Sequence, residues 1–582
     1  MALLENRRLH IALILLVGVA AYCMTFDVPF VFDDESSIVH NDVIRNLWTF
    51  LSGEGYGYSP RRFLGYLTIA VNYWAGGLQV AGYHVVNLVI HLACAILVYF
   101  LGKSTFRTPR MADTSLSERA GPVSLFAALL FVAHPVQTQA VTYVIQRLAS
   151  LATFFYLLSL LLYVVASLRE RKGAAGRAPL YLGSLLAAVL AMKTKEIAFT
   201  LPFAIVLYEI LFFGPPRRER LRWLLPFALT LPIIPLSLVH FGPVDPAVLD
   251  GTERISADLG TPRHHYLFTQ FRVIATYLRL LFLPVRQNLD YDYPLFTSFL
   301  EPQVALSFLL LAAILCAAFW LIARARRSGD SSLLVVSFGT IWFFLALSVE
   351  SSVIPIKDVI FEHRLYLPSV GAFLALATGG ALLARRLPRG VATAAAGCIV
   401  LLLAGSTFAR NQVWRDEVTL TRDIAEKSPE KARVHANLAA ALLKKGELDE
   451  ALREAELSAR LNPAKVEPHN ILGMLYGRAG AYDRAIAELS TAVSIDPKFP
   501  PARENLGDAY RGKGMYPQAI EHYQAALKLQ PLSAELYNKR GTAYGEMGDM
   551  ANAAASFAEA LRLDPANAVY RANARAASGG SP

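Results

Sequence analysis

Charged residues are scarce in this sequence of 582 residues, and their scarcity excludes an ordinary soluble protein. Asp, Glu, Lys and Arg make up 18% of the chain, against 54% hydrophobic residues. Soluble domains carry about 25% charged residues. The deficit lies before Asn411, where apolar runs alternate with short basic segments, whereas Ala, Leu, Glu, Lys and Arg alternate after it. The composition predicts a membrane protein with a polar C-terminal part.

Cysteine and glycosylation signals are also scarce. The four cysteines all lie in apolar runs, where each is expected to be a small buried hydrophobe, so neither a disulfide framework nor a cysteine metal site is expected. The chain contains no Asn-x-Ser/Thr acceptor. With the Ala, Leu and Arg bias, this absence favours a bacterial inner membrane over the endoplasmic reticulum membrane. The first apolar run, 9–25, lacks a clear cleavage site and is expected to be retained.

Basic clusters predict how the chain threads the membrane. They lie at 7–8, 103–119, 169–177, 217–222, 324–327 and 385–389, each beside an apolar run. We therefore interpret them as topology signals rather than as a nucleic-acid-binding face. Eleven spans put every cluster in the cytoplasm, with a cytoplasmic N-terminus and a periplasmic C-terminal part. The predicted spans are 9–25, 83–102, 122–134, 149–168, 178–193, 197–213, 222–241, 303–323, 332–349, 366–384 and 391–409.

Two further apolar stretches are excluded from this count. Stretch 63–80 contains Asn72 and a glycine pair, and stretch 266–283 carries Arg272 and Arg279 on one helical face. Both suit helices that lie at the membrane surface. If only one of them crossed the membrane, the downstream basic clusters would face the wrong side. If both crossed it, the clusters after the second crossing would face the cytoplasm again.

A repeat occupies the polar C-terminal part. Prolines at 429, 463, 497, 531 and 565 recur every 34 residues, which is the period of tetratricopeptide repeats. In phase with them, small residues occupy 439, 473, 507 and 541, and larger residues occupy 489, 523 and 557. The pattern predicts stacked helical hairpins with a concave groove. Asn437 and Asn505 hold equivalent positions on first helices, as peptide-binding amides or as ordinary surface residues.

The strongest chemical signal in the membrane half is the acidic triplet Asp33, Asp34 and Glu35, directly after the first span. Three adjacent carboxylates repel one another, so at least one is expected to have a raised pKa unless a cation or a metal neutralises it. A carboxylate of this kind suits general-base catalysis on a substrate hydroxyl. The alternative is a solvated acidic loop that helps to orient the chain.

A second polar group follows the third span. His134 precedes Pro135, which breaks the helix, and Gln137 and Arg147 follow. Polar groups at such a break must face water, protein or a ligand rather than lipid. Arg147 is either a phosphate contact or an interfacial anchor. On the second span, His84, Asn87 and His91 share one face and are predicted to hydrogen-bond to neighbouring spans rather than to a metal.

Further candidate substrate-binding residues lie in the other outer segments. One pair, Lys195 and Glu196, resembles an adjacent ion pair with a mainly structural role. A second group opens the tenth predicted span and consists of Glu362, His363 and Arg364. It is either an ion pair that fixes the loop or a set of phosphate and sugar contacts. These candidates are Arg61, Lys195, Glu196, Glu362, His363 and Arg364.

The membrane half resembles the transmembrane-and-tetratricopeptide-repeat family of protein O-mannosyltransferases and their bacterial relatives, within the GT-C glycosyltransferase superfamily. The resemblance extends from the first span to the segment before the repeats. The matching stretches are FVFDDESSIVHND, NYWAGGLQVAGYHVVNLVIH, AHPVQTQAVTYVIQR, KTKEIAFTLP, NLDYDYP, ESSVIPIKDVIFEHRLYLPS and RNQVWRDEVTL.

The resemblance implies an all-α, GT-C-like membrane domain of about eleven spans, followed by a tetratricopeptide-repeat superhelix. It implies that Asp33 or Asp34 deprotonates or orients an acceptor hydroxyl, and that Arg147 and Arg364 stabilise the leaving phosphate of a polyprenyl-linked sugar donor. Transfer in this superfamily inverts the anomeric centre, with a divalent metal in some members. The family pattern has an acid where this chain has Gln139, and also differs near Gln146.

We therefore expect an inverting membrane glycosyltransferase that modifies an exported protein held in the repeat groove. The alternatives are a transferase or ligase that acts on an envelope glycan, and a non-enzymatic scaffold that assembles a complex through the repeats. The expected domains are a membrane domain at 1–410, a linker with a leading helix at 411–431, four repeats at 432–573 and a flexible tail at 574–582.

The topology is tested by reporter fusions at Gly329 and Gly579. Alkaline phosphatase fused at a given position is active only outside the cytoplasm. Green fluorescent protein fused at the same position becomes fluorescent only inside it. We expect Gly329 fusions to report the cytoplasm and Gly579 fusions the opposite side. The same side for both positions would contradict the eleven-span count.

Overall fold

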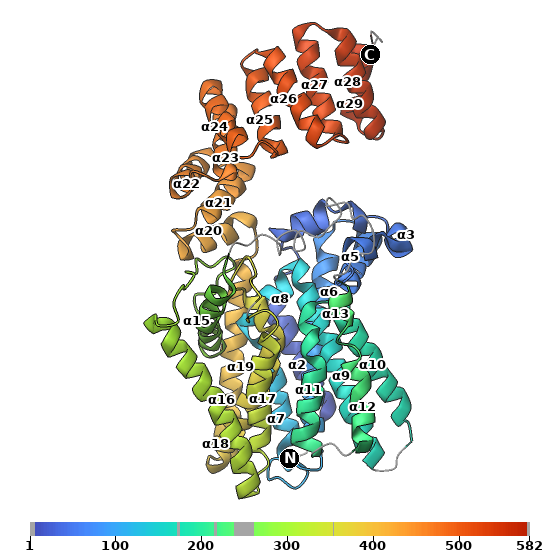
Figure 1. The fold of residues 1–582 in the computed structure, drawn as a ribbon, viewed down its shortest axis with the longest axis vertical. Coiled ribbons are helices and arrows are strands. Elements are labelled where there is room, and N and C mark those ends of the chain that lie inside the picture. The colour runs from blue at the N-terminus through green and yellow to red at the C-terminus, as the bar shows by residue number, and fades with distance from the viewer. Residues whose placement is uncertain (1–5, 172–174, 215–217, 238–260, 353, 579–582) are drawn as a thin grey trace. The chain divides into compact units, whose positions relative to one another are not determined.

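The structure is a computed structural model that divides into two compact units, Met1–Asp416 and Glu417–Pro582 (Figure 1). The described part of the chain forms helices and turns, with no β-strand in it, so the predicted all-α fold class is confirmed. The division falls within the predicted linker. The described residues are 6–171, 175–214, 218–237, 261–352 and 354–578.

Long helices fill the first unit, and each predicted span coincides with helical segments. Most positions in these helices are apolar, because side chains that face lipid and side chains that face the core are both apolar. The longer helices are α2 (Arg7–Tyr22), α6 (Val80–Thr105), α7 (Ala120–Ala133), α9 (Arg147–Arg171), α10 (Arg177–Met192), α11 (Leu201–Tyr208), α12 (Arg218–Ala228), α16 (Pro302–Ser328), α17 (Leu333–Leu347), α18 (Tyr366–Leu383) and α19 (Arg389–Gln412).

The number of spans stays a prediction. Six helical stretches among the described residues are long and apolar enough to cross a membrane, or seven if the bent pair Ser117–Ala133 and Pro135–Thr142 is one span. The predicted span 222–241 coincides with α12 and with the short α13 (Ile233–Leu236), and residues 238–241 lie outside the described residues.

The long helices differ in how much of their surface the unit covers. In α6 and in the stretch that contains α9, 67% of the most apolar 18-residue segment is buried within the protein. The corresponding share is only 17% in α16 and 11% in α19. Close packing within the unit is clearest between α17 and α18, where a Cβ on Gly339 would collide with the Gly371 carbonyl oxygen. The exposed apolar faces of α16 and α19 suit contact with lipid.

Short elements gather with the helices α5 and α15 at the end of the unit opposite the N-terminus, where Figure 1 shows α5, α8 and α15. Both excluded stretches form helices there, α5 and α15. The elements around this end are η1 (Glu35–Val39), η2 (Asp42–Ile44), α3 (Leu47–Thr49), η3 (Phe50–Glu54), α4 (Gly55–Tyr58), α5 (Phe63–Gly76), η5 (Pro135–Gln137), α8 (Thr138–Thr142), η6 (Val144–Gln146), η7 (Glu196–Thr200), α15 (Arg263–Phe282) and η9 (Glu362–Leu365). The remaining short elements are η4 (Ser117–Arg119), η8 (Glu209–Phe213) and η10 (Ala384–Arg386).

The second unit consists of helical hairpins with the predicted 34-residue period. Glycines with positive φ at 446, 480, 514 and 548 separate the two helices of each hairpin. The helices are α20 (Glu417–Lys427), α21 (Ala432–Lys445), α22 (Leu448–Leu461), α23 (Val466–Arg478), α24 (Tyr482–Ile495), α25 (Pro500–Gly512), α26 (Tyr516–Leu529), α27 (Ala534–Met547), α28 (Met550–Leu563) and α29 (Ala568–Ala577).

Small and large side chains pair within the hairpins as the sequence predicts. A Cβ added to Gly507 would lie 2.7 Å from the Tyr523 ring, and one added to Gly541 would lie 2.8 Å from the Phe557 ring. The absent Cβ therefore lets the paired helices approach.

This packing is tested by Gly541→Ala, with Gly545→Ala on the same helix as the control. The first change presses a methyl group onto Phe557 and is expected to lower stability by about 1–3 kcal/mol. At Gly545 the nearest atom to an added Cβ is 3.9 Å away, so its higher helix propensity is expected to stabilise the helix by about 0.5–1 kcal/mol. Thermal unfolding followed by circular dichroism distinguishes the two, and equal melting temperatures would contradict the packing argument.

Candidate functional site

The acidic triplet follows a turn with an unusual backbone. Phe32 has a φ of 50°, in the left-handed region that residues other than glycine rarely adopt. Beyond it, Asp33 is exposed, Asp34 is fully buried and Glu35 is half-buried. The three adjacent carboxylates therefore lie in three different environments.

Asp34 ties this turn to the broken helix. Its Oδ2 accepts a hydrogen bond from the Val31 N–H at 3.2 Å, and its Oδ1 accepts one from the Ile145 N–H at 2.8 Å. Burial raises the pKa of Asp34 to about 8, although the two N–H donors oppose this shift and the charge of Asp33 adds to it. The sequence correctly predicts a raised pKa in the triplet, but burial is the main cause rather than charge repulsion.

Asp33 presents its side chain at the surface. Its N–H donates to the hydroxyl of Tyr143 at 2.8 Å, just before η6. Glu35 begins η1 and lies 3.7 Å from the Nδ1 of His40. Of the two predicted catalytic aspartates, Asp33 is therefore the one that a substrate can reach.

His134 and Gln137 have internal partners at the break between α7 and α8. The Nδ1 of His134 accepts from the Val136 N–H at 3.2 Å, and its Nε2 lies 3.1 Å from the Leu281 carbonyl oxygen. Gln137 donates through Nε2 to the Ser369 hydroxyl at 2.9 Å. Both side chains thus help to fix the turn, and the buried Oε1 of Gln137 has no hydrogen-bond partner among the described residues.

Arg147 is also engaged internally, which favours a structural role over a phosphate contact. The side chain is fully buried. Its Nε donates to Asn87 Oδ1 at 2.6 Å, its Nη1 to Asn72 Oδ1 at 2.6 Å and to the Thr68 carbonyl at 3.2 Å, and its Nη2 to the Tyr83 carbonyl at 2.9 Å. All three nitrogens therefore have protein acceptors, so Arg147 fixes α5 and α6 against α9 and does not suit a phosphate contact.

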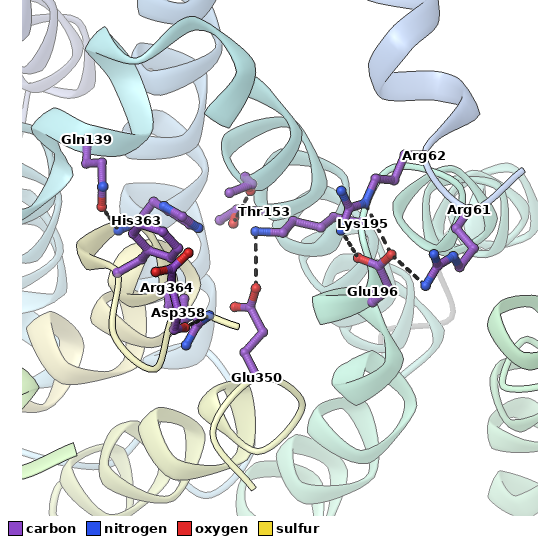
Figure 2. Close-up of polar contacts among 12 residues, drawn as sticks. Arg61, Arg62, Gln139, Thr153, Lys195, Glu196, Glu350, Asp358, His363 and Arg364 are labelled. Carbon is purple, nitrogen blue, oxygen red and sulfur yellow. Dashed lines mark hydrogen bonds and ion pairs between the residues drawn. The ribbon is translucent and has the colours of Figure 1, made fainter. Parts of the chain in front are cut away.

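Other cations gather a short distance along the same end of the unit (Figure 2). The Nη1 of Arg61 lies 3.4 Å from Glu196 Oε1, and the Nε of Arg62 lies 3.2 Å from it. Lys195 pairs with Glu350 at 3.2 Å. These side chains come from η7 and from the loops before α5 and before η9. The group named here the cation cluster consists of Arg61, Arg62, Lys195 and Arg364.

The predicted pair of Lys195 with Glu196 is wrong. Lys195 has extended backbone, with φ −160° and ψ 150°, so the side chains of consecutive residues point to opposite sides. Lys195 therefore reaches Glu350, and Glu196 reaches the two arginines. Figure 2 shows the two side chains pointing apart.

Arg364 and its neighbours also differ from the predicted ion pair. Arg364 donates to the carbonyls of Asp358 at 2.8 Å and Val359 at 3.0 Å. Glu362 accepts from the N–H of Asn288 and the hydroxyl of Tyr291 through Oε1, at 2.8 and 2.6 Å. Glu362 therefore binds the loop after α15, whereas Arg364 binds the loop before η9.

Several buried polar atoms in this region have no hydrogen-bond partner among the described residues. They include His363 Nδ1, Arg364 Nε and Gln139 Nε2. The His363 N–H donates to Gln139 Oε1 at 2.7 Å, which links η9 to α8. Buried polar groups without partners are costly, so this group suits a polar ligand. Four cations and the carboxylates of Glu196, Glu350 and Asp358 leave one formal positive charge.

The repeat asparagines belong to the second unit. Asn505 donates to Asn470 Oδ1 at 2.8 Å, and Asn573 donates to Asn538 in the same way at 2.8 Å. Asn437 is half-buried on α21. The amide nitrogen of Asn505 is therefore already hydrogen-bonded to the first helix of the preceding repeat.

Sequence reasoning did not find Arg62, Glu350 or Tyr143. Arg62 adjoins a residue that was found, and Glu350 begins an outer loop with a second acid, but Tyr143 lies in an apolar stretch without any local signal. No group of three or more histidine, cysteine, aspartate or glutamate side chains suited to a metal ion occurs in the described ranges.

The structural role of Asp34 is tested by Asp34→Asn. The amide NH₂ of asparagine would face a backbone N–H, so we expect a loss of about 1–3 kcal/mol in stability. Because the pKa of Asp34 is raised on folding, its protonation stabilises the fold below about pH 4, and this stabilisation is lost as the pH rises through about 8. The melting-temperature difference between wild type and Asp34→Asn is expected to shrink over that range, whereas a constant difference would contradict the shift.

Known proteins resemble this chain in both halves. Models described as tetratricopeptide repeat match residues 466–499 and 534–567, and one described as TPR repeat matches 507–548. A thermophilic TPR protein of Thermus thermophilus is 22% identical, covers 31% of this chain and 94% of its own, and gives a TM-score of 0.26.

Curated relatives extend the match into the membrane half. Protein O-mannosyl-transferase TMTC4 of Homo sapiens is 30% identical over 34% of this chain and 29% of its own length. Protein O-mannosyl-transferase F38B6.6 of Caenorhabditis elegans is 25% identical over 78% of this chain and 63% of its own, and TMTC3 of Homo sapiens is 24% identical over 76% and 50%. The chain spans less than two thirds of each of these relatives, and its predicted resemblance to the transmembrane-and-tetratricopeptide-repeat protein O-mannosyltransferases is confirmed over most of its length.

Proposed function

We propose that the chain is a membrane glycosyltransferase that moves a sugar from a polyprenyl-phosphate-linked donor to a hydroxyl of an exported protein. The names of its relatives make mannose the first sugar to test. The proposed location is a bacterial inner membrane, with the site and the repeats on the periplasmic side.

One observation carries the proposal: the exposed Asp33 is bound at one end of α8, and the segment that carries the buried Arg364 is bound near the other end. Tyr143 follows the C-terminal end of α8 and binds Asp33, and Gln139 near its start binds His363, next to Arg364. Five helical residues span only about 7.5 Å. A base and a phosphate site on the two sides of so short a helix suit one sugar phosphate and its acceptor.

The proposed reaction uses these two groups in one displacement. Asp33 takes the proton of the acceptor hydroxyl, whose oxygen forms a bond to the anomeric carbon. The bond from that carbon to the phosphate oxygen breaks, and the polyprenyl phosphate leaves with the electron pair. The cation cluster stabilises the leaving negative charge. Attack on the face opposite the leaving group inverts the anomeric centre.

The internal contacts narrow the set of residues with direct roles. Asp34, Arg147 and Glu362 have their polar atoms occupied by the protein, so we assign them to the support of the site. Lys195 and Arg364, together with Arg61 and Arg62, are the proposed phosphate contacts. The unpartnered Nδ1 of His363 and Nε2 of Gln139 suit hydroxyl groups of the sugar.

The repeats are proposed to hold the acceptor protein. Charge parity along the chain predicts that they lie on the same side of the membrane as Asp33. Grooves of stacked helical hairpins are surfaces that bind extended segments. An anchor for a scaffold needs only one span and no cation cluster, so the transferase is favoured over the scaffold.

The proposed function is tested by Asp33→Asn, with Asp42→Asn as the control. Asp42 lies in the same outer loop, with 91% of its side chain exposed and an ion pair to Arg45 at 3.3 Å. Loss of the base is expected to lower the transfer rate by about 100- to 10,000-fold, and the control is expected to keep wild-type activity.

Transfer is measured with purified full-length chain, polyprenyl-phosphate-mannose and a serine- and threonine-containing exported protein, by intact-mass analysis of that protein. Exported proteins from cells that carry each variant, or a full deletion, are compared in the same way. Unchanged glycosylation in both Asp33→Asn and the deletion would exclude the proposal.

A further inference from the structure

A buried tyrosine contacts the proposed base. Tyr143 is 3% exposed and stands between α8 and η6. Its hydroxyl accepts the Asp33 N–H at 2.8 Å and also hydrogen-bonds the Asp33 carboxylate. One side chain therefore contacts both the main chain and the side chain of Asp33.

The hydroxyl of Tyr143 remains a donor at neutral pH. Burial, and then the nearby carboxylates of Asp33 and Asp34, hold the pKa of Tyr143 well above its usual range. The protonated hydroxyl donates to the carboxylate while it accepts from the amide. A carboxylate held in this way loses rotational freedom before the substrate arrives, which favours reactive geometry.

The left-handed backbone at Phe32 makes this support necessary. Such a conformation is unfavourable in an L-residue and persists only where surrounding contacts fix it. The contacts on its C-terminal side are the amide of Asp33, bound to Tyr143, and the carboxylate of Asp34, bound to Ile145. Tyr143 thus helps to hold the turn that presents Asp33.

The ring of Tyr143 is itself held by the segment that leads into the repeats. Its centroid lies 6.0 Å from the ring of Trp414, which is 1% exposed. Asn411 accepts a hydrogen bond from the Thr142 hydroxyl at 2.7 Å and donates to the Ala21 carbonyl at 3.0 Å. The residues directly before α20 are therefore bound to the same turn as Asp33.

We propose that Tyr143 is a positioning residue for Asp33, and that Trp414 fixes the Tyr143 ring, so that the segment before the repeats supports the active site. The proposal rests on the proposed function, because it assigns Asp33 as the base. It adds two residues that act through Asp33 and do not touch the substrate.

The test compares Tyr143→Phe with Tyr99→Phe. Tyr99 is a fully buried tyrosine on α6, and its hydroxyl lies 3.1 Å from the Nδ1 of His10 on α2. Each change removes one oxygen atom and leaves the ring. We expect Tyr143→Phe to lower kcat about 10- to 100-fold, with the KM for the acceptor within about twofold of wild type. Tyr99→Phe is expected to keep wild-type kcat.

A double-mutant cycle separates positioning from a general loss of packing. In the Asp33→Asn background, Tyr143→Phe is expected to cause no further loss in rate, because Tyr143 acts through the carboxylate that is already gone. Trp414→Phe keeps an aromatic ring at position 414 and leaves the Tyr143 hydroxyl in place. It is therefore expected to lower kcat less than Tyr143→Phe does. Melting temperatures of all variants are measured on the full chain.

Three results would overturn the positioning role. They are wild-type kcat in Tyr143→Phe, an equal loss in both backgrounds, and a loss that appears only in KM. Full activity in Asp33→Asn would instead overturn the proposed function, so the two failures are distinguishable.

Discussion

A helix that breaks inside a membrane protein must find partners for its freed backbone groups within the protein, because lipid offers none. The break between α7 and α9 meets this constraint with side chains from distant segments. Asn87 donates to the carbonyl of Val141 at the end of α8, Asp34 accepts from the N–H of Ile145, and Gln287 donates to the carbonyl of Pro135. The second span, the first outer loop and the loop after α15 are therefore drawn to one turn, and the candidate site is assembled around it.

Much of this arrangement follows from local sequence. The proline after His134 predicts the break, the 34-residue period predicts the hairpins, and the hydrogen-bonding roles of His84, Asn87 and His91 are confirmed by partners on neighbouring elements. These features are predictable because each depends on backbone chemistry or on spacing along a single helix. The acidic triplet is likewise visible as a group.

The sequence does not show which polar groups the fold occupies internally. The acceptors of Arg147 come from residues 60 to 79 positions away, so nothing in its own turn distinguishes a phosphate contact from a structural one. Lys195 and Glu196 are neighbours in sequence, but their backbone sends them to different partners. Asp33 is exposed and Asp34 is buried because of the turn at Phe32, although the two residues are chemically identical and adjacent in sequence. The chemical type of each residue is local information, whereas its availability is set by tertiary structure.

The exposed faces of α16 and α19 have a consequence for how the sequence varies. A face in contact with lipid has no complementary protein surface to match, so Leu, Ile, Val and Phe are interchangeable there at little cost, while a charge is excluded. At Gly339 and Gly371 the opposite holds, because each backbone fills the space that a side chain on the other would need. Substitutions are therefore expected to accumulate on the outward faces of these two helices and to be rare where α17 meets α18.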